Sequence, residues 1–122
     1  MSNSRPDIVG THQGAYAVSQ TTSWAALTSA SFKDLRSAVA TPAALPASLT
    51  FTNATVVNTH ATQSLYIRLA SLAAGDDATP SITIGPGASY DVPMYGPGVT
   101  AISVRGSGAA TTGVIHAYFV AR

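Results

Sequence analysis

The stretch ITIGPGASYDVPMYGPGVTAISVRGSG, residues 82–108, contains two Gly-Pro-Gly triplets, each placed between two short runs of alternating apolar and polar residues. Glycine allows the positive φ that tight turns require, and proline presets φ for the first central position of a turn. Alternation with a period of two is typical of strands that bury one face. The stretch therefore predicts short strands separated by turns.

A phosphate-binding loop is the alternative interpretation of the two triplets. That motif requires Gly-x-Gly-x-x-Gly at the start of a helix. Tyr90 stands at the third glycine position after the first triplet and Ala101 after the second, and strand-like runs follow both. We therefore interpret both triplets as turns.

The same period of two extends over residues 47–122, where five or six strands can be counted. This pattern predicts a mainly β fold, either an antiparallel β-sandwich or a jelly-roll-like barrel. Pro93 cannot donate a backbone hydrogen bond, so the run 88–95 is expected at a sheet edge or at a bulge. The predicted core consists of Ile67, Leu69, Ile82, Ile84, Ile102 and Val104.

The first third of the chain has a different organisation. Residues 1–10 are polar and are expected to form a flexible N-terminal arm, followed by a single domain over residues 11–122 with one or two short strands at its start. A short helix is predicted near residues 31–40, because Ser31 precedes Asp34 by three residues as in a capping box. The helical spacing there is carried by Phe32, Leu35 and Val39.

Charged residues make up only 9% of the chain, against about 25% in a typical domain, and glutamate is absent. The basic residues are Arg5, Lys33, Arg36, Arg68, Arg105 and Arg122. They are scattered along the chain, so no nucleic-acid partner is expected. A surface of small, uncharged residues suits a protein whose faces are covered by neighbouring subunits.

Candidate catalytic and ligand-binding residues are few. The three histidines, His12, His60 and His116, lack metal-ligand spacing, and the pair Asp76-Asp77 lacks a third ligand. The sequon at Asn53 is interpreted as strand residues, and no Gly-x-Ser-x-Gly elbow occurs. With no cysteine either, we expect no enzyme activity, no cofactor and no metal.

No secretory signal or membrane span is recognised in the chain, so it is expected to be soluble, unprocessed and without a membrane partner. The final run, residues 112–122, has apolar residues on both faces. Such a strand predicts a second covering layer, either the helix of this chain or another subunit.

Three runs carry a resemblance to a known class of proteins: LTFTNATVVNTHATQSLYIRLA, PSITIGPGASYDVPM and AISVRGSGAATTGVIHAYFVA. Together they resemble the small Ala/Thr/Gly-rich β-sandwich virion proteins of tailed bacteriophages, over roughly residues 47–122. The resemblance implies a structural role in the particle, assembled in the bacterial cytoplasm, with no active-site residues to carry over.

The leading hypothesis is a capsid decoration or cement protein, a homo-oligomer with a trimer favoured, whose partner is the major capsid protein or another virion protein. Its expected interface comprises Arg5 and Ile8 in the arm and Tyr118 and Arg122 in the last strand. A neck, tail, baseplate or fibre component is the first alternative. The other is a carbohydrate-binding sandwich, which would need the aromatic residues Tyr90, Tyr95 and Trp24 to converge.

Overall fold

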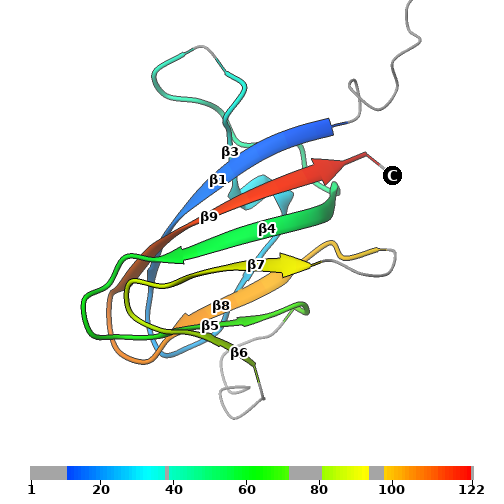
Figure 1. Cartoon of the computed structure of the whole chain (residues 1–122). Coiled ribbons are helices and arrows are strands. Elements are labelled where there is room, and N and C mark those ends of the chain that lie inside the picture. Colours follow the sequence, from blue (N-terminus) through cyan, green and yellow to red (C-terminus); the bar gives the residue numbers. More distant parts are fainter. Residues whose placement is uncertain (1–10, 38, 72–80, 94–97, 122) are drawn as a thin grey trace, which may run out of the picture.

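The computed structural model describes residues 11–37, 39–71, 81–93 and 98–121, which form two antiparallel β-sheets packed face to face (Figure 1). The five-stranded sheet has the order β3-β1-β9-β4-β7. Its strands are β1 (Thr11–Gln20), β3 (Lys33–Asp34), β4 (Thr50–Asn58), β7 (Ser89–Pro93) and β9 (Thr111–Val120). The four-stranded sheet has the order β2-β8-β5-β6. Its strands are β2 (Ala25–Leu27), β5 (Leu65–Arg68), β6 (Ile82–Ile84) and β8 (Ile102–Gly106). The predicted mainly β sandwich is confirmed.

The strand pairs are nested along the chain. β1 pairs with β9, β2 with β8, β4 with β7, and β5 with β6. This is the pattern of one long hairpin folded over onto itself, and the additional pairs β4–β9 and β5–β8 join its two arms within each sheet. Eight strands connected in this way form a jelly roll, to which β3 is added at the edge beside β1.

The core lies between the inner faces of the two sheets. At its centre, the ring of Phe119 lies 4.5 Å from that of Phe51 and 5.2 Å from that of Phe32, measured between ring centroids. Of the predicted core residues, Ile67, Ile84, Ile102 and Val104 are buried, and Ile82 packs against the core while partly exposed. Leu69 is 37% exposed, because β5 ends at Arg68 and the alternation ends with it.

The first Gly-Pro-Gly triplet forms the predicted turn. The backbone N–H of Ala88 donates to the carbonyl of Gly85 at 3.0 Å, and Gly87 has a φ of 73°. Proline at the first central position and a positive φ at the second are the marks of a type II turn. The turn connects β6 to β7 and thereby carries the chain from one sheet to the other. Only Gly98 of the second triplet lies in the described part, with a φ of 83°.

The predicted helix near residues 31–40 is wrong. A 3-10 turn covers Ser29–Ser31, and the chain then enters β3. Phe32 is fully buried, but Leu35 is 46% and Val39 63% exposed, so the three residues share no buried face. The backbone instead bonds to its neighbours, with the N–H of Leu35 donating to Gln13 at 2.9 Å.

The capping-box prediction for Ser31 and Asp34 fails for the same reason. Ser31 accepts a hydrogen bond from the backbone N–H of Thr28 at 3.1 Å, and Asp34 accepts one from the N–H of Arg36 at 2.8 Å. Both are local turn contacts on either side of Phe32. The Ser31 contact caps the short 3-10 segment Ser29–Ser31, and the Asp34 contact holds a turn after β3, so neither starts an α-helix.

The start of the domain is one strand of ten residues, β1, rather than the one or two short strands expected. Gly14 lies inside β1 instead of bending it, and a Cβ there would meet Leu45 at 2.7 Å and Phe32 at 2.8 Å. Glycine at this position lets the segment around β3 pack directly on β1. The predictions on the arm, residues 1–10, lie outside the described residues.

Candidate functional site

The five-stranded sheet has an outer face directed away from the core, and β9 is the third of its five strands. The inner side chains of β9, from Ile115 to Phe119, are fully buried. Its outer side chains are exposed or half-buried: Thr112, Val114, His116, Tyr118 and Val120. The expected covering helix is absent from the described residues, so no layer of this part of the chain lies over them.

One row of side chains crosses this outer face from edge to edge. The register places Lys33 beside Ala15, Ala15 beside His116, His116 beside Thr55, and Thr55 beside Asp91. Residues directly opposite each other in an antiparallel ladder point to the same face. The row therefore carries one positive charge at the β3 edge, one negative charge at the β7 edge and a histidine at its centre.

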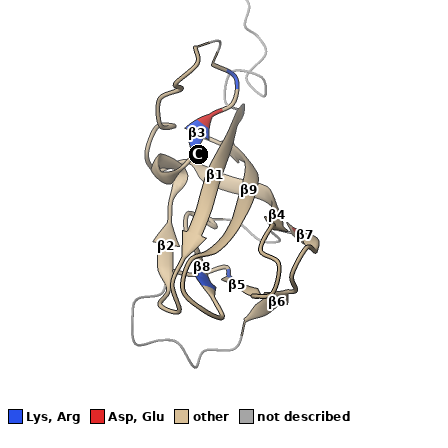
Figure 2. Ribbon diagram, turned by 90° about the vertical axis from the view of Figure 1, so that its left-hand side faces the viewer, with Lys and Arg blue, Asp and Glu red and all other residues tan. Residues whose placement is uncertain are grey.

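The charge at the β7 edge is fixed in position. The hydroxyl of Thr55 donates to Oδ1 of Asp91 at 2.6 Å, and the carboxylate is exposed. Lys33 is exposed at the opposite edge. No other charged side chain projects from the described strands of this sheet on this face, and Figure 2 shows how little of the ribbon is charged.

The neighbouring rows of the face are uncharged. Tyr118 lies between Gln13 and Asn53, is 43% exposed, and its hydroxyl accepts a hydrogen bond from Nε2 of Gln13 at 3.4 Å. Val114 lies between Ala17 and Val57 in the row on the other side of His116. Of the sequence-predicted interface residues, the structure places Tyr118 at the middle of this face, whereas Arg5, Ile8 and Arg122 lie outside the described residues.

The outer face of the four-stranded sheet carries a second cluster. The guanidinium carbon of Arg105 lies 5.2 Å from the ring centroid of Trp24 and 4.3 Å from that of Tyr66. Both distances are within the range of a cation–π contact. Trp24 is only 5% exposed, so this cluster offers no open indole face for stacking on a ligand. It could not be found from the sequence, because only the pairing of β8 with β2 and β5 brings the three residues together.

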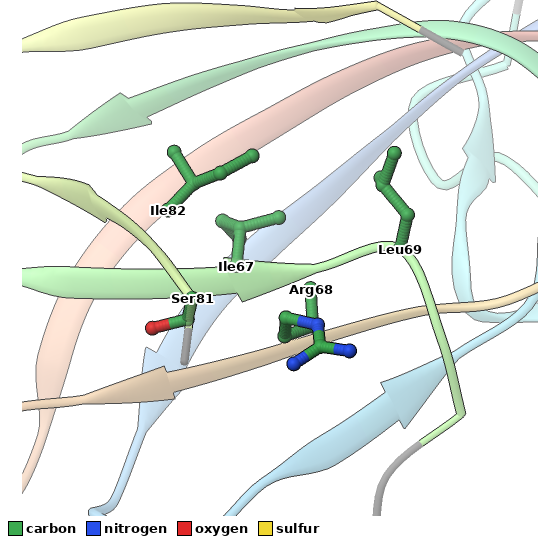
Figure 3. Close-up of a pocket in the computed structure, with 5 residues that line it drawn as sticks. All are labelled: Ile67, Arg68, Leu69, Ser81 and Ile82. Atoms are coloured by element: carbon green, nitrogen blue, oxygen red, sulfur yellow. The ribbon is translucent and has the colours of Figure 1, made fainter. Parts of the chain in front are cut away.

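A pocket of about 490 Å³ lies at the end of β5 and β6. Its lining residues are Ile67, Arg68, Leu69, Ser81 and Ile82. Figure 3 shows the side chains of Ile67, Leu69 and Ile82 on one side of β5 and Arg68 on the other. The lining is mainly apolar and lacks the converging polar groups that orient a specific ligand.

The titratable residues do not gather into a site. His12 and His116 occupy opposite faces of the five-stranded sheet, and Nδ1 of His60 accepts the backbone N–H groups of Thr62 and Gln63 in a turn. Within the described ranges, no group of three or more His, Cys, Asp or Glu residues could hold a metal ion. The pair Asp76-Asp77 lies outside them.

The aromatic residues proposed for sugar binding do not converge where they are described. Trp24 is buried beside the four-stranded sheet, while Tyr90 is 43% exposed on β7 of the other sheet. Tyr95 lies outside the described residues.

The chain matches no family model, no curated protein and no solved structure. Within the part of the chain that is described, no helix has the length and apolarity needed to cross a bilayer.

Proposed function

We propose that this chain is a structural virion protein of a tailed bacteriophage, most specifically a decoration protein that binds the assembled head and stabilises it. The observation that carries the proposal is the uncovered outer face of the five-stranded sheet, which has charges only at its two edges. Depletion of charged residues is a compositional mark of the centre of a protein–protein interface. The resemblance of residues 47–122 to virion proteins is our reason for proposing that the protein covering this face belongs to a phage particle.

The mechanism is linkage between binding and shell stability. A protein that binds the assembled shell but not the free subunits shifts the equilibrium towards the shell by mass action. Such a protein needs no reacting group. It needs a rigid body and complementary surfaces. The jelly roll supplies the rigid body through a closely packed core in which the rings of Phe32, Phe51 and Phe119 contact one another.

The fold by itself does not choose between the hypotheses, since jelly rolls occur in both viral capsid and lectin domains. A lectin-like role would use an exposed aromatic platform. Trp24 is buried and lies next to the four-stranded sheet, whereas Tyr90 lies on β7 of the five-stranded sheet. This separation favours the structural role over the carbohydrate-binding role. A neck, tail, baseplate or fibre component remains the second candidate, because the same face would serve in a ring or on an axis.

The test is to add the purified chain to undecorated heads and measure both occupancy and the melting temperature of the shell. We expect saturable loading and a higher shell melting temperature. Heads that take up no chain would overturn the decoration role, and loading of tails or necks instead would favour the second candidate.

Two variants then identify the contact surface. A truncation lacking residues 1–7 tests the expected arm, and Tyr118→Arg places a charge at the middle of the exposed sheet face. The matched control is Thr83→Arg, an exposed position on the strand β6 of the other sheet. A truncation that still loads fully would remove the arm from the interface.

A further inference from the structure

We infer that the outer face of the five-stranded sheet packs against the same face of a second copy of this chain, around a two-fold axis that runs parallel to the strands over β9. The inference deepens the proposed function and rests on it in one respect, namely that this face is an assembly surface. It names a second copy of the chain as the occupant of the face, so that Tyr118→Arg tests this pairing and the truncation of residues 1–7 tests the contact with the head.

The position of β9 makes the face self-complementary. β9 is the third of five strands, with β1 and β3 on one side and β4 and β7 on the other. Neighbouring strands lie about 4.8 Å apart, so Lys33 on β3 and Asp91 on β7 are each about 10 Å from β9 and belong to the same row. A two-fold rotation about an axis along β9 exchanges the two edges of the sheet. It brings Lys33 of each copy opposite Asp91 of the other.

Charge decides between the two simplest orientations of such a pair. If the axis ran across the strands instead, each edge would meet itself, and Lys33 would face Lys33 while Asp91 faced Asp91. Like charges placed opposite each other at an interface are unfavourable. The axis along the strands gives two opposite-charge pairs at the rim, where ion pairs fix register more than they add affinity.

The central strand supplies the uncharged middle of the interface. On an axis along β9, Val114, His116 and Tyr118 each lie opposite their own copies. They are flanked by Ala17, Val57 and Asn53, none of which is charged. A centre without Lys, Arg, Asp or Glu that contains an aromatic residue, with charges confined to the edges, matches the usual anatomy of a protein–protein interface.

The size of the face is adequate for a dimer. Three strands of nine or ten residues, β1, β4 and β9, and the shorter β3 and β7, spaced about 4.8 Å apart, give a face of roughly 600 Å². Two such faces bury about 1,200 Å² in total, which is the lower end of the range of specific protein–protein interfaces, about 1,200 to 2,000 Å². Two twisted sheets can pack with their strands aligned to within about 30°. This angle displaces the edge of one sheet sideways relative to the facing edge of the other. The long, flexible side chain of Lys33 can still reach Asp91 of the second copy across that displacement.

This pairing is two-fold, whereas the resemblance led us to expect a trimer. The two assemblies differ in solution mass, so one measurement on the free chain separates them. Because that measurement contains no heads, its outcome is independent of whether the chain decorates a capsid.

The test is a charge exchange in the full-length chain, read as the dimer dissociation constant by sedimentation velocity. Lys33→Asp alone and Asp91→Lys alone each place like charges at both rim contacts, and we expect each to weaken the dimer about tenfold or more. The double variant Lys33→Asp/Asp91→Lys restores opposite charges and is expected to recover most of the affinity. Thr83→Asp, an exposed position on the outer face of the other sheet, should leave the dissociation constant unchanged.

Folding of each variant is checked by its thermal unfolding, since Asp91→Lys also removes the hydrogen bond from Thr55. Lys33→Asp removes no hydrogen bond between described side chains, so it provides the cleaner single change. A wild-type chain that stays at its monomer mass of 12.4 kDa at all concentrations would overturn the inference. So would a double variant that is no tighter than the two single variants. The head-loading assay is then run separately, and its failure would count against the proposed function alone.

Discussion

At the scale of single residues, Asn58 is a buried polar group that links the two sheets of the sandwich. It is fully buried at the end of β4. Its Nδ2 donates to the carbonyls of Gln63 at 2.8 Å and Ile84 at 3.0 Å, and its Oδ1 accepts the N–H of His60 at 2.9 Å. One side chain thus joins the end of a strand in one sheet to the connection leading to β5 and to β6 in the other.

Asn58→Asp keeps the shape of the side chain and removes both of its donors. We expect the free energy of unfolding to fall by about 2 to 5 kcal/mol at pH 7, because two buried carbonyl groups lose their partner. The loss should be smaller at pH 4, where a protonated carboxyl can donate one bond again. Urea unfolding of both chains at both pH values measures this, and an unchanged midpoint at pH 7 would contradict the assignment of these bonds.

Ile102 is a second residue whose role is sharply defined, since it is fully buried on β8. Ile102→Ala should lower the free energy of unfolding by about 2 to 5 kcal/mol, through lost burial and the cavity that remains. Ile82→Ala is the matched control, because Ile82 is only partly buried, and its effect should be clearly smaller. Equal effects of the two substitutions in urea unfolding would show that the register of β8 is wrong.

At the scale of elements, the sequence predicted the strands well where one face of the strand is buried. It failed near residues 31–40, where the backbone forms hydrogen bonds with residues far away in the sequence. β4 through β9 all lie in the region where alternation with a period of two was recognised. The edge position of the run containing Pro93 is likewise confirmed. The helix prediction failed because Phe32 is drawn into the core by contacts with Phe51 and Phe119, which no local spacing could reveal.

The turn between β6 and β7 is the element whose chemistry can be tested most simply. Gly87 has a φ of 73° and open space around it, so a side chain there meets only backbone strain. Gly87→Ala should lower the free energy of unfolding by about 1 kcal/mol. Gly85 also has open space but no positive φ in the range that disfavours side chains, so Gly85→Ala should change stability by less than about 0.5 kcal/mol. Thermal unfolding of the pair checks this, and equal losses would contradict a type II turn.

At the scale of the whole molecule, the sequence predicted a sandwich but not its connections. Alternation shows which residues of a strand are buried, but it does not show which strands are neighbours. The nested pairing of the jelly roll therefore came only from the structure. The same limit applies to the candidate site. Tyr118 could be nominated from an apolar strand face, but the row from Lys33 to Asp91 joins four strand pairs and depends on the register of each.

The absence of cysteine from the chain makes a direct test of the exposed sheet face possible. Val114→Cys places a single thiol on the outer face of β9, where the proposed two-fold axis brings it opposite its own copy. Thr83→Cys places one on the outer face of the other sheet as the control. Each variant is treated at micromolar concentration with a short bismaleimide, and the fraction of cross-linked dimer is measured.

We predict efficient cross-linking through Val114→Cys and little through Thr83→Cys, because only the first position lies in an interface between two copies. Cross-linking that is equally low for both, in chains whose thiols react fully with a monofunctional maleimide, would show that the face of the five-stranded sheet is not paired in this way.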